Sequence, residues 1–165
     1  MGNKSKALFI AMVFGLLAGC ATNPPAGPAF SDLAQVPPKQ GLATVYIYRE
    51  YAEPTAWNST IHVGSEKVAT LGQGEYTWIY AQPGNRKISG KWPLMSGQND
   101  AEIELSFAAN EVYFVDLIGI SQFSHMSYDT MYFNMGSGLN LVKPTEALQR
   151  LKTCCRLQSA LKPTY

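Results

Sequence analysis

Apolar and polar residues alternate along several short segments of the chain. In AEIELSF (residues 101–107), Ile103, Leu105 and Phe107 alternate with Glu102 and Glu104, which is typical of a strand with one buried and one solvated face. Seven further segments are rich in β-branched and aromatic residues: 42–49, 59–63, 67–71, 75–81, 86–92, 111–119 and 127–135. Turn residues separate these segments at roughly 8- to 12-residue intervals, which favours a sandwich. The pattern predicts an all-β fold, an antiparallel β-sandwich over residues 41–143.

The pattern changes after residue 143. Pro144 and Glu146 suit the first turn of a helix, where proline lacks only a free N–H and an acid meets the positive end of the dipole. Leu148, Leu151 and Cys155 follow at i, i+3 and i+7, the spacing of one apolar helix face. Residues 144–165 are therefore predicted to form a short C-terminal helix and tail that cover the sandwich.

The first 19 residues have the three parts of a secretory signal peptide. Lys4 and Lys6 precede a run of twelve apolar residues, 7–18, and the small residues Ala18 and Gly19 end it. A helix needs about 20 apolar residues to span the hydrocarbon core of a bilayer, so twelve are too few. We interpret residues 1–19 as a signal peptide.

Leu17-Ala18-Gly19-Cys20 resembles the lipobox of bacterial lipoproteins. The resemblance implies cleavage before Cys20, a diacylglycerol on its sulfur and a fatty acid such as palmitate on its new amine. Two or more chains anchor stably, because each buried CH₂ contributes about 0.8 kcal/mol. Ala21 follows where lipoproteins of the inner membrane commonly have Asp, which implies the outer membrane, with the domain in the periplasm.

Five prolines lie between Ala21 and Gln40. Such a segment favours extended polyproline geometry with a reach of at most about 60 Å for twenty residues. We expect residues 20–40, the lipidated Cys20 included, to tether the domain to the membrane, with a protease-resistant core starting near Gly41. Packing of Phe30 or Leu33 onto the domain would shorten the reach.

Composition excludes some classes of function. The chain is 46% hydrophobic and 15% charged, which indicates a globular protein with a core. Without residues 1–19 it carries 11 basic and 12 acidic residues. This balance gives no field that would attract nucleic acid, so no nucleic-acid partner is expected.

Residues for catalysis are scarce. The chain has two histidines, His62 and His125, and neither has the spacing of a zinc site. Ser124 and His125 with Asp116 or Asp129 could form a triad, but no nucleophile-elbow pattern accompanies them. We predict no enzyme activity, no metal site and no cofactor, and keep a hydrolase with an atypical active site as the alternative.

Two adjacent cysteines follow the predicted helix. A relaxed disulfide spans about 4.4 to 6.8 Å between Cα atoms, while neighbouring residues are about 3.8 Å apart. We favour Cys154 and Cys155 as buried small residues, with a vicinal or intermolecular bridge and a metal or catalytic role as alternatives. In that interpretation Cys155 is on the inner face of the helix and Cys154 is more reachable.

Aromatic residues are the remaining candidates for binding. Most of those in the predicted strands are expected to fill the core. Trp57 and Trp92 lie beside Asn58 and Pro93, next to predicted loops. We predict that these two are exposed partner contacts.

Three motifs lie within residues 37–118: PPKQGLATVYIYR, KVATLGQGEYTWIYAQPGNRKI and EVYFVDL. They resemble an uncharacterised family of bacterial lipoproteins with a domain of unknown function. The resemblance implies a PEGA-like, transthyretin-like β-sandwich in which the turn at Pro83-Gly84 connects two antiparallel strands. It implies no catalytic or binding residues.

Together these patterns predict a membrane-anchored lipoprotein of the cell envelope. Its expected role is a non-enzymatic binding or structural module, with the membrane as one partner through Cys20 and an envelope protein or a glycan as another.

Overall fold

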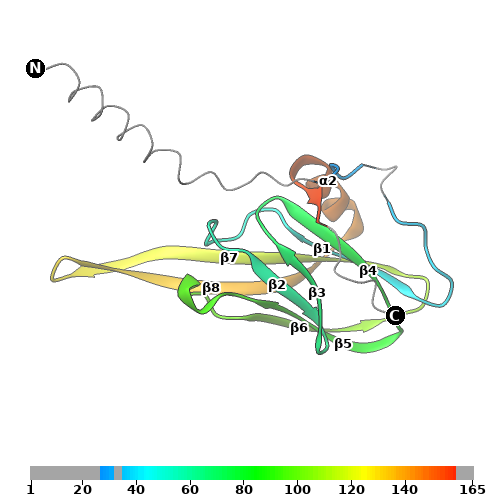
Figure 1. Ribbon diagram of the computed structural model, residues 1–165, viewed down its shortest axis with the longest axis horizontal. Coiled ribbons are helices and arrows are strands. Elements are labelled where there is room, and N and C mark those ends of the chain that lie inside the picture. The colour runs from blue at the N-terminus through cyan, green and yellow to red at the C-terminus, as the bar shows by residue number, and fades with distance from the viewer. Residues whose placement is uncertain (1–26, 32–34, 159–165) are drawn as a thin grey trace, which may run out of the picture.

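Two β-sheets stack face to face and a helix covers the outer side of one of them (Figure 1). The computed structural model describes residues 27–31 and 35–158. One sheet has the strand order β8-β7-β1-β4-β9 and the other β3-β2-β5-β6. The elements are β1 (Ala43–Arg49), β2 (Ser59–Val63), β3 (Glu66–Leu71), β4 (Glu75–Ala81), β5 (Gly84–Lys91), the 3₁₀ helix η2 (Leu94–Ser96), β6 (Ala101–Phe107), β7 (Val112–Ser127), β8 (Thr130–Val142), α2 (Pro144–Cys154) and β9 (Arg156–Leu157).

This architecture confirms the predicted all-β sandwich with a short C-terminal helix. Most strand pairs are antiparallel, but β1 and β7 pair in parallel, as do β4 and β9. The segment AEIELSF forms β6 with the bounds expected from its alternation. Its glutamates are exposed, because β6 packs only one of its faces on the core.

β1 is buried along its whole length because it lies between two layers. Val45 and Ile47 belong to the core between the sheets. Tyr46 and Tyr48 point the other way and pack under α2 with Leu151. Alternation is therefore absent from this strand, as expected for one buried on both faces.

The predicted helix begins at Pro144 and its apolar stripe faces the sheet. Leu151 is fully buried and Cys155, which ends the helix, is 3% exposed. Leu148 is partly buried against the same cluster. The outer face of the five-stranded sheet thus has a second apolar cluster of its own.

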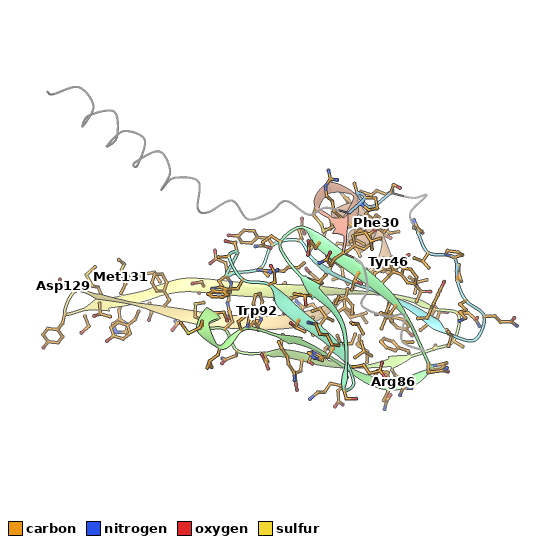
Figure 2. The ribbon with its side chains drawn as sticks, in the orientation of Figure 1. Phe30, Tyr46, Arg86, Trp92, Asp129 and Met131 are labelled. Atoms are coloured by element: carbon orange, nitrogen blue, oxygen red, sulfur yellow. A yellow bond between two sulfur atoms is a disulfide. The ribbon has the colours of Figure 1, made fainter. Side chains whose placement is uncertain are left out.

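The prediction of a free tether over residues 20–40 is wrong for its described part. Phe30 is 3% exposed, and its ring lies 5.3 Å from that of Tyr76 and 6.0 Å from that of Tyr46, between centroids (Figure 2). The Phe30 N–H donates to the Cys155 carbonyl oxygen at 2.9 Å. Burial of this aromatic ring beside α2 removes a large apolar surface from water, which favours docking of the segment. Leu33 lies outside the described residues.

Two turns differ from the expectations. Pro83-Gly84 joins β4 to β5, which belong to different sheets, so it leads the chain across the sandwich and not between paired strands. The segment 127–135, expected as one strand, contains a turn at Tyr128 and Asp129, whose φ angles are 46° and 62°. Because neither residue is glycine, the composition of this segment concealed the turn.

Candidate functional site

β7 and β8 continue as a two-stranded ribbon well past the rest of the sandwich (Figure 1). β1 pairs with β7 only as far as Asp116. From Leu117 to Ser127, β8 is the only strand of the described part of the chain that pairs with β7. We call residues 119–137 the projecting hairpin. Figure 2 shows Asp129 and Met131 near its tip, far from Phe30 and Tyr46 under α2.

One face of the projecting hairpin is apolar and uncovered. Phe123, Met126, Met131 and Phe133 are 57%, 60%, 61% and 53% exposed. The strand register places them on the same face of the sheet as Leu117 and Leu139, whose side chains belong to the core. The hairpin therefore extends the inner face of the sandwich beyond the sheet that covers it, and we call these four residues the apolar face.

The opposite face of the hairpin carries the candidate Ser124 and His125. A bulge at this point turns His125 onto Tyr132, with the rings stacked 4.6 Å apart. Ser124 Oγ lies 3.2 Å from His125 Nδ1, and both residues are exposed. Within the described residues neither Asp116 nor Asp129 bonds to His125, and Asp116 lies nine residues back along the strand, about 30 Å away. The structure does not bring a triad together.

The base of the hairpin is held by backbone groups of two loops. The Glu53 N–H donates to the Gly119 carbonyl oxygen at 2.9 Å. Gln98 Nε2 donates to the carbonyl oxygens of Glu53 and Ile120, each at 3.0 Å. Ser137 Oγ donates to the Asn99 carbonyl oxygen. These contacts fix where the hairpin leaves the sandwich.

A fully buried arginine organises the loop that contains Glu53. Arg49 Nη1 donates to the carbonyl oxygens of Trp57 (2.7 Å) and Leu71 (3.1 Å), and Nη2 to those of Ala52 (2.7 Å) and Pro54 (3.0 Å). Burial lowers the pKa of its guanidinium to about 10, so it remains charged at neutral pH. Three carbonyl oxygens of the loop from residue 52 to 57 thus bind the Arg49 guanidinium. The sequence pattern did not indicate this role of Arg49.

The prediction that Trp92 is an exposed contact is wrong. Trp92 is 7% exposed, and the Arg49 guanidinium lies 4.8 Å from its ring centroid. A desolvated cation next to an indole ring gains cation–π energy, which explains why the ring turns inward beside Pro93. Trp57 is 39% exposed, so its prediction as a partner contact stands untested.

A polar cluster lies where α2 meets β7 and β1. Arg150 Nη1 is 3.0 Å from Asp116 Oδ2 and 3.7 Å from Glu50 Oε2, and Nη2 is 2.7 Å from Glu146 Oε1. Burial raises the pKa of the Asp116 carboxyl to about 6, against the opposing effect of Arg150. Burial also raises the pKa of the Tyr48 phenol, and the nearby Asp116 charge adds to it. An adjoining cleft of about 450 Å³ opens to solvent. The ion pair between Arg150 on α2 and Asp116 on β7 holds the helix against the sheet.

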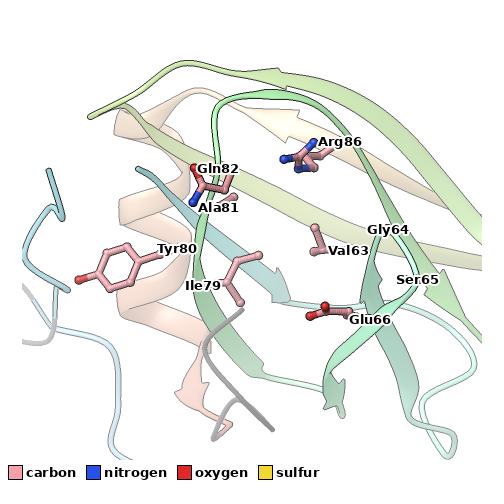
Figure 3. Close-up of a pocket in the computed structure, with 9 residues that line it drawn as sticks. All are labelled: Val63, Gly64, Ser65, Glu66, Ile79, Tyr80, Ala81, Gln82 and Arg86. Atoms are coloured by element: carbon pink, nitrogen blue, oxygen red, sulfur yellow. The ribbon is translucent and has the colours of Figure 1, made fainter. Parts of the chain in front are cut away.

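A second cavity of about 280 Å³ lies at the end of the sandwich near the turn at Pro83 (Figure 3). Val63 and Ile79 form its apolar side, and Glu66 and Arg86 line its rim. Arg86 Nη1 donates a hydrogen bond to the neighbouring Asn85 carbonyl oxygen.

Cys154 and Cys155 are bonded to each other, so the favoured prediction of two unbridged buried thiols is wrong. The helix ends between them: Cys155 has extended φ and ψ angles of −121° and 143°. The short distance between neighbouring Cα atoms does not prevent this disulfide. The burial of Cys155 is as predicted, at 3% exposure.

The remaining predictions concern the N-terminal segment, metal binding and membrane-spanning helices. The signal peptide and Cys20 lie outside the described residues. Among residues 27–31 and 35–158, no cluster of three or more potential ligands for a metal occurs, and no helix is long and apolar enough to cross a membrane.

One protein family, described as a protein of unknown function (DUF2846), matches residues 39–135. The match includes β1 to β7 and most of the projecting hairpin. No curated protein matches the chain.

Proposed function

The chain belongs to the DUF2846 family, and we propose that it is a lipid-anchored protein of the cell envelope that acts as a non-enzymatic binding module. Its binding surface is the apolar face of the projecting hairpin. The resemblance to PEGA-like domains stays a proposal about its sandwich.

The apolar face is the observation that carries the proposal. Its four side chains present on the order of 450 Å² of surface, taking about 200 Å² for each when fully exposed. Covering that area is worth roughly 11 kcal/mol before the costs of association. A surface of this kind on a monomer commonly marks an interaction site. It also lies on a ribbon whose base is fixed, so little order has to be gained on binding.

The lipobox residues Leu17 to Cys20 support an anchor on the outer membrane, with the domain in the periplasm. The docked N-terminal segment limits how far the domain can stand from it. A Cβ at Gly27 would overlap the Leu157 backbone, so the chain is already in contact with the domain there. Seven residue steps from Cys20 to Gly27 reach at most about 25 Å, less than half of the reach expected for a free tether.

Two measurements on the full chain in a Gram-negative host test the proposal. Cys20→Ser should release the chain from the membrane fraction, and unchanged partitioning would contradict the anchor. A photo-cross-linking amino acid at Met131, on the apolar face, should give a defined adduct. The same amino acid at Gln122, on β7 and on the opposite face of the hairpin, is the matched control. Equal or absent adducts at both positions would contradict the proposed binding surface.

A further inference from the structure

β8 is an edge strand that lacks the usual protection against pairing. Among the described residues it ends the five-stranded sheet and pairs with β7 alone. Its 13 residues, TMYFNMGSGLNLV, contain no charged residue and no proline. A long edge strand with these properties is a template for another strand.

The other three end strands of the two sheets are protected, and β7 has a free edge only in the projecting hairpin, beyond its pairing with β1. β6 carries Glu102 and Glu104, and β3 carries Glu66 and Lys67. β9 is only two residues long. Charged side chains and short length are common ways of blunting an edge. Because β8 has neither charged residues nor short length, we expect another strand to pair with its free edge in the cell.

We propose that the occupant is a second copy of this chain, whose β8 pairs antiparallel with the first to form a two-fold symmetric dimer. This inference rests on the proposed function and names the partner of the same surface. A two-fold axis requires a self-complementary patch. A neutral strand meets this requirement without repulsion between like charges.

The apolar residues around β8 fit such a pairing. Leu94 and Met95 are 97% and 81% exposed. They lie on the loop that Gln98 and Asn99 fasten to the hairpin base at Ile120 and Ser137. Antiparallel pairing along β8 brings the tip of each hairpin beside the base of its partner. The apolar face of each copy then covers Leu94 and Met95 of the other copy.

The surface available matches what a stable dimer needs. Four side chains at the tip and two at the base present on the order of 800 Å² per copy, again at about 200 Å² for each fully exposed side chain. A standard interface buries about 800 Å² per partner. The edge adds backbone hydrogen bonds along up to 13 residues.

Cross-linking at a register pair tests the edge directly. Asn134 and Gln122 are partners in the β7–β8 ladder and both are exposed, but Asn134 lies on β8, whereas Gln122 lies on β7, whose free edge is on the other side of the hairpin. A photo-cross-linking amino acid at Asn134 of the full chain, in the envelope of a Gram-negative host, should give an adduct of twice the chain mass that contains only this protein. The same amino acid at Gln122 should give at least tenfold less.

Charge variants make the test decisive. Phe133→Lys at the tip and Met95→Lys at the base should each reduce the Asn134 self-adduct at least tenfold, while Gln122→Lys leaves it unchanged. Met95 is largely exposed, so its variant keeps the test valid if Phe133→Lys misfolds. A self-adduct that persists in Met95→Lys overturns the proposed interface. Adducts only with lipid or with another protein overturn the dimer but leave the proposed binding surface intact, and the absence of adducts at both Asn134 and Met131 overturns both.

Discussion

Replacing Arg49 should loosen the base of the projecting hairpin through the loop it organises. The perturbation is Arg49→Met, which keeps length and removes the charge and all four donors to the carbonyl oxygens of Ala52, Pro54, Trp57 and Leu71. The Glu53 N–H that holds Gly119 belongs to this same loop. Stability and the local order of the hairpin base should therefore fall together.

The expected magnitude follows from opposing terms. A hydrogen bond from a charged donor is worth about 1.5 to 3 kcal/mol, so four give roughly 6 to 12 kcal/mol. The pKa of Arg49, lowered to about 10, indicates a burial cost of about 3 kcal/mol. Methionine regains part of the apolar contact with Trp92. We expect the free energy of unfolding to fall by about 3 to 5 kcal/mol, the usual range for breaking a buried charged network.

Urea unfolding of the full chain in mild detergent, followed by tryptophan fluorescence, measures the change. Arg86→Met is the matched control, because in the described part of the chain the Arg86 guanidinium bonds to the neighbouring Asn85 carbonyl oxygen, and it should cost less than about 0.5 kcal/mol. Hydrogen exchange of the Glu53 amide should accelerate in Arg49→Met alone. A loss below about 1 kcal/mol, or an unchanged Glu53 amide, would refute the role given to Arg49.

Three further variants test the packing around this framework. The pKa of Asp116 in the folded state, about 6, is above the ordinary aspartate value of 3.8, so its contribution to stability rises as pH falls through 6. Relative to Asp116→Asn, the protein should gain about 2 kcal/mol between pH 7 and 4.5 in urea titrations, and parallel pH profiles of the two proteins would contradict this. Phe30→Ala should lower the free energy of unfolding by about 3 to 4 kcal/mol, whereas a loss under about 1 kcal/mol would place Phe30 outside the domain. In Gly119→Ala the new Cβ would overlap the Glu53 carbonyl oxygen and should cost about 1 to 3 kcal/mol, while Gly136→Ala, which meets only a side chain of Ile120, should cost less in the same assay.

Local patterns in the sequence predicted the elements well. The alternation in residues 101–107 and the proline at the start of α2 are short-range signals, and both predictions are confirmed. The assignment of strands to sheets is a long-range property. Pro83-Gly84 is a turn in either arrangement, but only packing decides that β4 and β5 belong to different sheets.

The candidate site was largely beyond the reach of sequence patterns. Residues 127–135 contain good strand residues, and the turn at Tyr128 and Asp129 uses positive φ angles without glycine. Whether an apolar strand face is covered depends on the length of the opposite sheet, which no local pattern encodes. Trp92 was misplaced for a related reason, because its partner Arg49 is more than 40 positions away in the sequence.

Methionine oxidation in the intact envelope tests the central claim most directly, that the apolar face is covered in the working protein. Met126 and Met131 are 60% and 61% exposed in the single chain, so peroxide should reach them readily if nothing covers them. Peptide mass spectrometry of the full chain gives the rate at each residue, with the urea-unfolded chain as the reference. The account predicts oxidation about tenfold or more slower in the envelope than in the unfolded chain, because a covered thioether is less accessible to the oxidant. Rates within about twofold of the unfolded chain at both residues, as expected for side chains open to solvent, would contradict it.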